Sequence, residues 1–153
     1  MTLISLANGC LQTPGGWETG TVEKDVEDAI SRLLAADPTI GTAWQEHLDF
    51  CEGDESRGEY NDIGVIARHL VQLVADHQDA DVRAIFDVVE DVYAGTPSRE
   101  VRNLMTVGLI EDIQNSTSWP RSPVGSSAFL PFLKPLTLAA WNGHRQRWGT
   151  SET

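Results

Sequence analysis

Residues 98–115, SREVRNLMTVGLIEDIQN, have the pattern of a helix that is apolar on nearly every side. Two neighbouring lines of side chains, spaced three or four positions apart, run along it: Val101, Leu104, Met105, Gly108, Leu109 and Asp112, and then Val107, Ile110 and Ile113. Two such lines predict a helix that other elements cover on more than one side. Glycine is about 1 kcal/mol less favourable than alanine inside a helix. We therefore expect a neighbouring helix to approach closely at Gly108.

Helical spacing of apolar residues also occurs elsewhere along the chain, in residues 21–38, 39–53, 59–78, 79–95 and 129–148. No segment alternates apolar and polar residues between hairpin turns, which would indicate strands. The sequence therefore predicts an all-α protein of five to six helices.

The length of 153 residues suits one compact domain. We predict an irregular N-terminal arm over residues 1–20, which are rich in Gly, Thr and Pro, and an all-helical domain over residues 21–149. A disordered tail is expected over residues 150–153. Residues 60–114 are expected to form the centre of the domain, with the C-terminal helix packed across it.

Residues 80–114 contain two consecutive predicted helices joined by a short Gly-Thr-Pro turn. Each helix begins with an acid, a valine and an arginine, at Asp81–Arg83 and again at Glu100–Arg102. This pattern predicts an antiparallel helix pair similar to a HEAT-type unit. One pair does not make a solenoid, because helical arrays need about three or more units.

The formal net charge of -12 is concentrated in the first half of the chain. Residues 18–62 hold 13 acidic and 3 basic side chains, whereas residues from 116 onward hold 1 acidic and 4 basic ones. Such a field repels nucleic acid and anionic membranes and favours a basic protein partner, although it also serves solubility.

Two cysteines, Cys10 and Cys51, are too few for a disulfide scaffold, and reduced thiols indicate a cytoplasmic protein. No apolar run approaches the roughly 20 residues that a membrane span requires. The start, MTLISLANGC, lacks the basic leader and the long apolar stretch of an export signal.

Motifs that would indicate catalysis are missing from the sequence. There is no glycine-rich phosphate loop with its lysine, no serine nucleophile elbow and no His-Glu-x-x-His pair. We therefore predict a non-enzymatic protein without a cofactor. The acidic clusters are predicted to be solvated helix faces rather than paired catalytic carboxylates.

His47 and Cys51 are the nearest approach to a metal-binding pair, since residues four apart share a helix face. A structural zinc site needs four ligands, and no second pair stands ready in the sequence. Burial of Cys51 in the core, with His47 at its rim, is therefore the preferred interpretation, and no metal is predicted.

Trp119 lies in the predicted loop STSWPRSP, beside Pro120 and Arg121. A tryptophan in such a loop either completes the core from outside or anchors a partner, since Trp and Arg are common at the energetic centres of interfaces.

The segments IGVIARHLVQLV, IFDVVEDVY and VRNLMTVGLIEDIQN, followed by a C-terminal FLxP and a Trp, carry a family resemblance. Over residues 20–148 the chain resembles a family of small, acidic, all-helical bacterial proteins of unknown function that occur among the presumed immunity proteins of toxin systems. The resemblance implies a binding protein that blocks a toxin and uses no cofactor.

A cationic toxin would suit this acidic chain, because complementary fields speed encounter. The predicted contacts are the acids of residues 46–62 together with the loop tryptophan: Glu46, Asp49, Glu52, Asp54, Glu55, Glu59, Asp62 and Trp119. Two other hypotheses belong to different classes of protein. One is a scaffold that uses residues 80–114 as a docking groove, and the other is an enzyme or metal-binding protein centred on His47 and Cys51.

Overall fold

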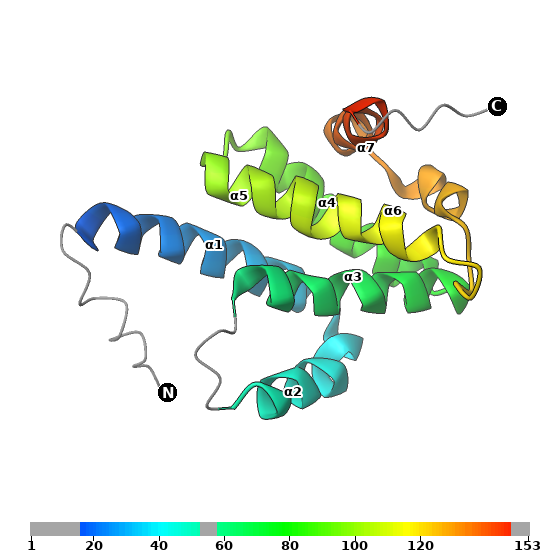
Figure 1. The fold of residues 1–153 in the computed structure, drawn as a ribbon, viewed down its shortest axis with the longest axis horizontal. Coiled ribbons are helices and arrows are strands. Elements are labelled where there is room, and N and C mark those ends of the chain that lie inside the picture. The colour runs from blue at the N-terminus through cyan, green and yellow to red at the C-terminus, as the bar shows by residue number, and fades with distance from the viewer. Residues whose placement is uncertain (1–15, 53–57, 148–153) are drawn as a thin grey trace.

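The computed structural model describes the backbone of residues 16–52 and 58–147, and the side chains of residues 24–52 and 58–143. These residues form helices and no strand, so the predicted all-α class is confirmed (Figure 1). The elements in chain order are α1 (Gly16–Ala36), η2 (Pro38–Ile40), α2 (Gly41–Phe50), α3 (Glu59–Ala75), α4 (Asp79–Ala94), α5 (Arg99–Asn103), η3 (Leu104–Ile110), α6 (Glu111–Thr117), η4 (Ser126–Phe132) and α7 (Pro135–Arg147).

The predicted count of five to six helices is not confirmed, because the described residues contain seven α-helices, two 3-10 helices and one π-helix. Three of these elements, α5, η3 and α6, follow one another without a break. Helix α1 begins at Gly16, inside the segment 1–20 that the sequence predicted as an irregular arm. The rest of that arm and the predicted tail over 150–153 lie outside the described residues.

The centre of the core is the contact between α3 and η3, which lie side by side. Ile63 and Leu70 of α3 and Leu104 and Leu109 of η3 are completely buried. Helix α7 packs on α4 and on η3, and its Trp141 stacks against Phe129, with 6.1 Å between the ring centroids. The prediction that residues 60–114 form the centre, with the C-terminal helix across it, agrees with this packing.

The HEAT-like helix pair is not confirmed. Helix α4 packs mainly against α1 and α7, whereas η3 packs mainly against α3. The hydroxyl groups of Tyr93 on α4 and Thr106 on η3 do form a hydrogen bond of 2.7 Å. Arg83, at the start of α4, lies over the ring of Phe132 at 5.0 Å from its centroid rather than beside an acid of the following helix.

The segment η3 is a π-helix in the middle of the helix predicted for residues 98–115. Most of its side chains are buried as predicted, but Val107 is 40% exposed. The wider i→i+5 turns of a π-helix shift the direction in which later residues point. The prediction from α-helical periodicity that Val107 is buried together with Ile110 and Ile113 is therefore wrong.

Gly108 lies where η3 meets α3, so the predicted close approach of a neighbouring helix is confirmed, and the structure shows that this helix is α3. A Cβ atom added there would be 2.6 Å from Cγ2 of Ile63 and 3.3 Å from Cδ1 of Tyr60. The first distance is shorter than carbon atoms can approach without displacement. Glycine at this position therefore permits the two helices to touch.

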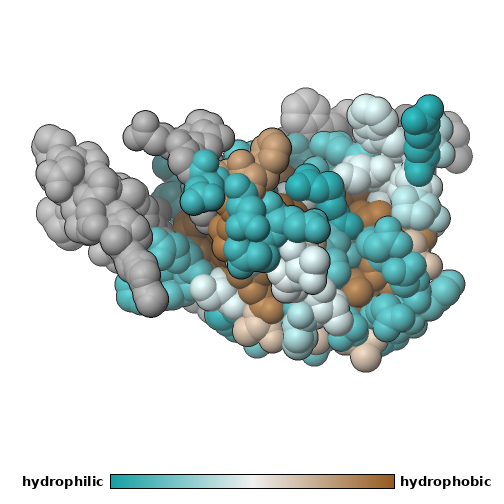
Figure 2. All heavy atoms as spheres, turned by 90° about the horizontal axis from the view of Figure 1, so that it is seen from below, coloured by the Kyte–Doolittle hydropathy of each residue, from teal (hydrophilic) through white to brown (hydrophobic). Residues whose placement is uncertain are grey.

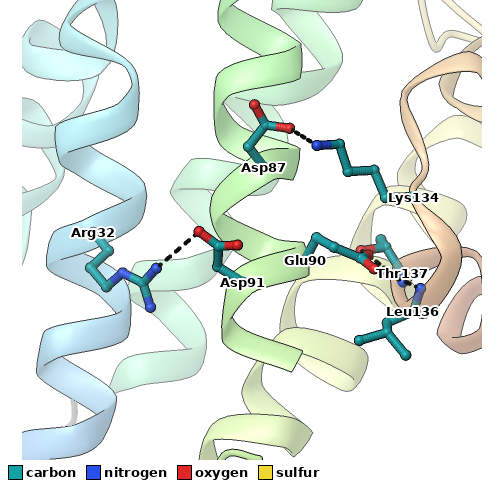
Figure 3. Close-up of polar contacts among 7 residues, drawn as sticks. All are labelled: Arg32, Asp87, Glu90, Asp91, Lys134, Leu136 and Thr137. Atoms are coloured by element: carbon teal, nitrogen blue, oxygen red, sulfur yellow. Dashed lines mark hydrogen bonds and ion pairs between the residues drawn. The ribbon is translucent and has the colours of Figure 1, made fainter. Parts of the chain in front are cut away.

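Helix α7 is anchored by the carboxylate of Glu90 on α4 (Figure 3). Glu90 accepts hydrogen bonds from the backbone N–H groups of Leu136 and Thr137, at 2.9 and 3.0 Å, and from the Thr137 hydroxyl at 2.8 Å. A carboxylate at a helix N-terminus satisfies otherwise unpaired N–H groups. Burial acts to raise the pKa of Glu90, but these hydrogen bonds and the charge of Lys134 together hold it below its ordinary value.

Two ion pairs flank Glu90 on α4 (Figure 3). Lys134 lies 2.5 Å from Asp87, and Arg32 of α1 lies 3.7 Å from Asp91. Both pairs are largely exposed, so each contributes little to stability. The Glu90 hydrogen bonds, rather than the exposed ion pairs, therefore fix the start of α7.

Candidate functional site

Helix α2 lies on α3 and has no fully buried residue (Figure 1). Two histidine–carboxylate contacts hold this part of the chain in place. His47 of α2 places Nε2 at 2.7 Å from Oδ1 of Asp62, at the start of α3. His69 of α3 places Nε2 at 2.7 Å from Oδ2 of Asp37, which caps η2 through a hydrogen bond from the backbone N–H of Thr39. Polar contacts as well as apolar packing therefore position α2.

A cleft of about 540 Å³ opens between α2, α3 and the π-helix with its continuation into α6. Its lining includes His47 and Cys51 from α2 and its C-cap, Arg68 from α3, and Asp112 from α6. Gly64 and Gly108 also line it, at the contact between α3 and η3. Elements that are far apart in the sequence thus build a single concave surface.

Exposed apolar side chains surround this cleft. Phe50 is 90% exposed, Tyr60 is 46% exposed and Val107 is 40% exposed, and all three line the cleft. In Figure 2, which views the molecule from the side of α2, apolar surface shows between hydrophilic side chains. Aromatic side chains that stay exposed next to one another on a folded protein are typical of interaction surfaces.

The predicted contact acids divide into three groups. Four of them are exposed on α2, directly after it or at the start of α3: Glu46, Asp49, Glu52 and Glu59. Asp62 is buried and accepts from His47, so it supports the surface from beneath rather than facing a partner. Asp54 and Glu55 lie outside the described residues.

Asp112 is a half-buried acid in the cleft wall. Burial raises the pKa of its carboxyl group, and the nearby charge of Arg68 offsets this only in part. Burial therefore makes the ionised form of Asp112 less favourable than it would be in water. A second cation in the cleft would stabilise this ionised form.

Cys51 is half-buried and lines the cleft, so it does not lie in the core as predicted. Its Sγ lies 3.8 Å from Nδ1 of His47. No group of three or more His, Cys, Asp or Glu side chains among the described residues is arranged to hold a metal ion. His47 and Cys51 alone fall short of the usual ligand number for zinc.

Trp119 is 70% exposed just beyond the end of α6, so it does not complete the core. It is not among the residues that line the cleft. Its exposed ring is thus outside the lining of the cleft.

Sequence reasoning missed Phe50, Tyr60, Arg68 and Asp112 as members of a site. Two of them carried a signal. Phe50 falls outside the stripe formed by Trp44, Leu48 and Cys51, so a helix that packs through that stripe exposes it. Asp112 lies on an otherwise apolar line within residues 98–115. An acid at such a position is expected to lie next to buried surface, which marks it for a special role.

Among the described residues, no helix is both long enough and apolar enough to cross a membrane. A family model with the description "Domain of unknown function (DUF7674)" matches residues 30–149. No curated protein and no solved structure matches the chain. The matched residues include the whole cleft, from α2 to α6.

Proposed function

The chain belongs to the DUF7674 family, a domain of unknown function, and we propose that it is a non-enzymatic binding protein for a basic protein partner. The observation that carries this proposal is the combination of the exposed Phe50 and Tyr60 with exposed acids on or next to the same two helices, α2 and α3. Interfaces commonly place aromatic anchors at the centre and polar residues at the rim.

Charge selects the kind of partner. Glu46, Asp49, Glu52 and Glu59 are exposed on or next to the helices that carry Phe50 and Tyr60, and the protein as a whole carries a net charge of -12. A partner with a basic patch would be steered to this surface, whereas acidic proteins and nucleic acids would be repelled. The half-buried Asp112 supplies one further acid that a partner's cation would compensate.

Neutralisation of a basic toxin is the specific form of this function that we propose. An inhibitor must reach its target quickly, and opposite fields raise association rates well above those of neutral proteins. A cationic nuclease is the type of enzyme that such an acidic surface suits. Support for this form comes from charge and from the resemblance of residues 20–148 to presumed immunity proteins.

The first experiment isolates a partner with the purified protein as bait and then measures the dissociation constant with the purified partner. Phe50→Ala is expected to weaken binding by at least about 30-fold, the effect of losing an interface anchor of about 2 kcal/mol. Its folding stability should change by less than about 0.5 kcal/mol, because Phe50 is 90% exposed. Leu136→Ala, at an exposed position on α7, is the matched control and should leave binding unchanged.

The second experiment tests the charge. Reversal of Glu46, Asp49, Glu52 and Glu59 to lysine should weaken binding by at least about 10-fold at low salt, and the difference should shrink as salt is added. The control reverses four exposed acids elsewhere, so that net charge changes equally: Asp25, Glu27, Asp76 and Asp79. A captured partner with an acidic isoelectric point, or equal effects of both reversals, would contradict the proposal.

The toxin hypothesis is tested by the genes next to this one. The expected result is a neighbouring gene for a basic enzyme whose activity is lost when one equivalent of this protein is added. The reversal of Glu46, Asp49, Glu52 and Glu59 to lysine should restore that activity. A partner that binds at the cleft without losing any activity would overturn the inhibitor hypothesis and leave the binding function in place.

A further inference from the structure

Cys51, His47 and Asp62 form a continuous chain of contacts beside the cleft. The thiol sulfur lies 3.8 Å from Nδ1 of His47, and Nε2 of the same ring lies 2.7 Å from Oδ1 of Asp62. Cys51 and His47 both line the cleft, while Asp62 is buried behind them. The proposed docking of a basic partner makes no use of the Cys51 thiol.

The order of the contacts matches the order that a nucleophile requires: an attacking atom, a base within reach of its proton and a third group that orients the base. With the carboxylate of Asp62 as acceptor, the proton of a neutral His47 ring is on Nε2. The lone pair of Nδ1 is then available to the thiol proton. The buried carboxylate would stabilise the imidazolium formed when that proton is transferred.

The position of Cys51 restricts the chemistry. Cys51 is the C-cap of α2, and its backbone N–H already donates to the carbonyl of His47 at 3.0 Å. A base within reach of the sulfur therefore has to take the thiol proton as the sulfur attacks. Acyl transfer needs N–H donors for an oxyanion, and a helix C-terminus presents carbonyl groups instead.

Reduction of a peroxide requires no oxyanion donors, because its leaving oxygen needs only a proton. We propose that Cys51 is an oxidation site for a small hydroperoxide such as hydrogen peroxide, with His47 as the base and Asp62 as a positioning residue. The proton of the thiol moves to Nδ1 of His47 as sulfur attacks one peroxide oxygen. The S–O bond forms, the O–O bond breaks, and the leaving hydroxide takes the proton from His47 to form water.

The product is a sulfenic acid at Cys51. The cysteine loses two electrons, and the peroxide gains them on reduction to water. The cleft gives a small oxidant access to the sulfur, and Arg68 brings a positive charge to the same wall. This inference goes beyond partner binding and does not rest on it.

The test uses the full chain with Cys10→Ser, so that Cys51 is the remaining thiol. The protein is treated with hydrogen peroxide at pH 7, and the sulfenic acid is trapped with dimedone and quantified by mass spectrometry. Cys51 is expected to react at least about 10-fold faster than free cysteine, and His47→Gln should remove at least about 10-fold of the rate, in line with loss of a general base.

His77→Asn is the matched control, because His77 is exposed and does not line the cleft. It should leave the rate unchanged. Because Cys51 in an unfolded chain would react at the rate of free cysteine, circular dichroism must show that His47→Gln keeps the helical content of the parent. A rate for Cys51 no faster than that of free cysteine, or a rate that His47→Gln leaves unchanged, would overturn the proposal.

Asp62 is tested in a double-mutant cycle with His47. Asp62→Asn alone should slow the oxidation of Cys51, and it should have no further effect in His47→Gln, because Asp62 acts through the ring of His47. An effect of Asp62→Asn that is the same with and without His47 would contradict its assignment as a positioning residue.

Discussion

Replacement of Gly108 by alanine tests the close contact between η3 and α3. The added Cβ would lie 2.6 Å from Cγ2 of Ile63, 3.3 Å from Cδ1 of Tyr60 and 3.4 Å from Cδ1 of Leu104. Tyr60 is half-exposed and can turn away, but Ile63 is completely buried and its β-branched side chain is stiff. The helices must therefore separate slightly at this point.

The two opposing contributions can be estimated. Overpacking of a core costs about 1–3 kcal/mol, and alanine gains up to about 1 kcal/mol over glycine in a helix. Gly108→Ala is therefore expected to destabilise the protein by about 1 kcal/mol, and Gly108→Leu by about 2 kcal/mol or more. For a chain of this length, 1 kcal/mol corresponds to a fall in Tm of about 2–4 °C.

Gly64→Ala is the matched control within α3. A Cβ there would meet the Arg68 side chain at 3.4 Å and the Asp112 carboxylate at 3.6 Å, which are ordinary contact distances. This substitution should raise stability by up to about 1 kcal/mol. Urea unfolding followed by circular dichroism gives both free energies of unfolding.

A double-mutant cycle with Ile63→Ala separates the clash from other effects. Ile63→Ala alone should cost about 2–5 kcal/mol. It also removes the Cγ2 atom that Gly108→Ala would strike. The double variant should therefore be more stable than the sum of the single effects predicts, by about 1 kcal/mol. Strict additivity, or a Gly108→Ala protein as stable as the parent, would refute the close contact.

Three further substitutions test the anchoring of α7 and the two differently placed tryptophans. Glu90→Gln should lower stability by about 1–2 kcal/mol at pH 7. The folded state lowers the pKa of Glu90, so the ionised carboxylate stabilises the protein above the ordinary pKa of glutamate. This stabilisation is lost as the pH falls through the lowered pKa. The urea midpoints of the parent and of Glu90→Gln should therefore converge in acid. Trp141→Ala should cost about 3–5 kcal/mol in urea unfolding, since Trp141 is 1% exposed. Trp119→Ala, at 70% exposure, should change the free energy of unfolding by less than about 0.5 kcal/mol.

The helical periodicity of apolar residues predicted the class of fold and much of the core. Val82, Ile85, Phe86 and Val89 are all buried on α4, and Gly95 is its C-cap. These features depend on local spacing and on the turn chemistry of single residues, which a sequence displays directly. Gly108 was predictable for a similar reason, since a glycine inside an apolar helix requires an explanation in packing.

The π-helix and the pairing of α3 with η3 could not be predicted. A π-helix keeps the same residues buried over most of its length, so the apolar pattern alone does not distinguish it from an α-helix. Which helix covers which face depends on contacts between distant segments. The short Gly-Thr-Pro turn suggested a local helix pair, but η3 packs mainly against α3 instead.

The candidate site was predicted only where its residues lie on one helix. His47 and Cys51 are four positions apart, so the sequence placed them on one face. The contact of His47 with Asp62 bridges α2 and α3, and it changes the role of Asp62 from a surface acid to a buried support. Asp112 joins the cleft only because α6 continues from η3 along α3.

Asp112 connects the stability of the protein with its proposed binding. Burial raises the pKa of its carboxyl group above the ordinary value, and Arg68 offsets this only in part. A raised folded-state pKa contributes stability below the ordinary pKa, and this contribution is lost as pH rises through the raised value. At pH 7 the ionised carboxylate therefore disfavours folding, and proteins retain such residues where function requires them.

Asp112→Asn separates the two effects. The variant should be more stable than the parent at pH 7, by an amount on the order of 0.5 kcal/mol, and this advantage should disappear in acid. The same variant should bind a basic partner more weakly, because the cleft loses an acid that the partner's cation would compensate. Urea midpoints between pH 3 and 7 and the dissociation constant measure the two quantities. A variant that is less stable at pH 7 would show that Asp112 supports the fold. A variant that binds as tightly as the parent would show that Asp112 does not contribute to the interface.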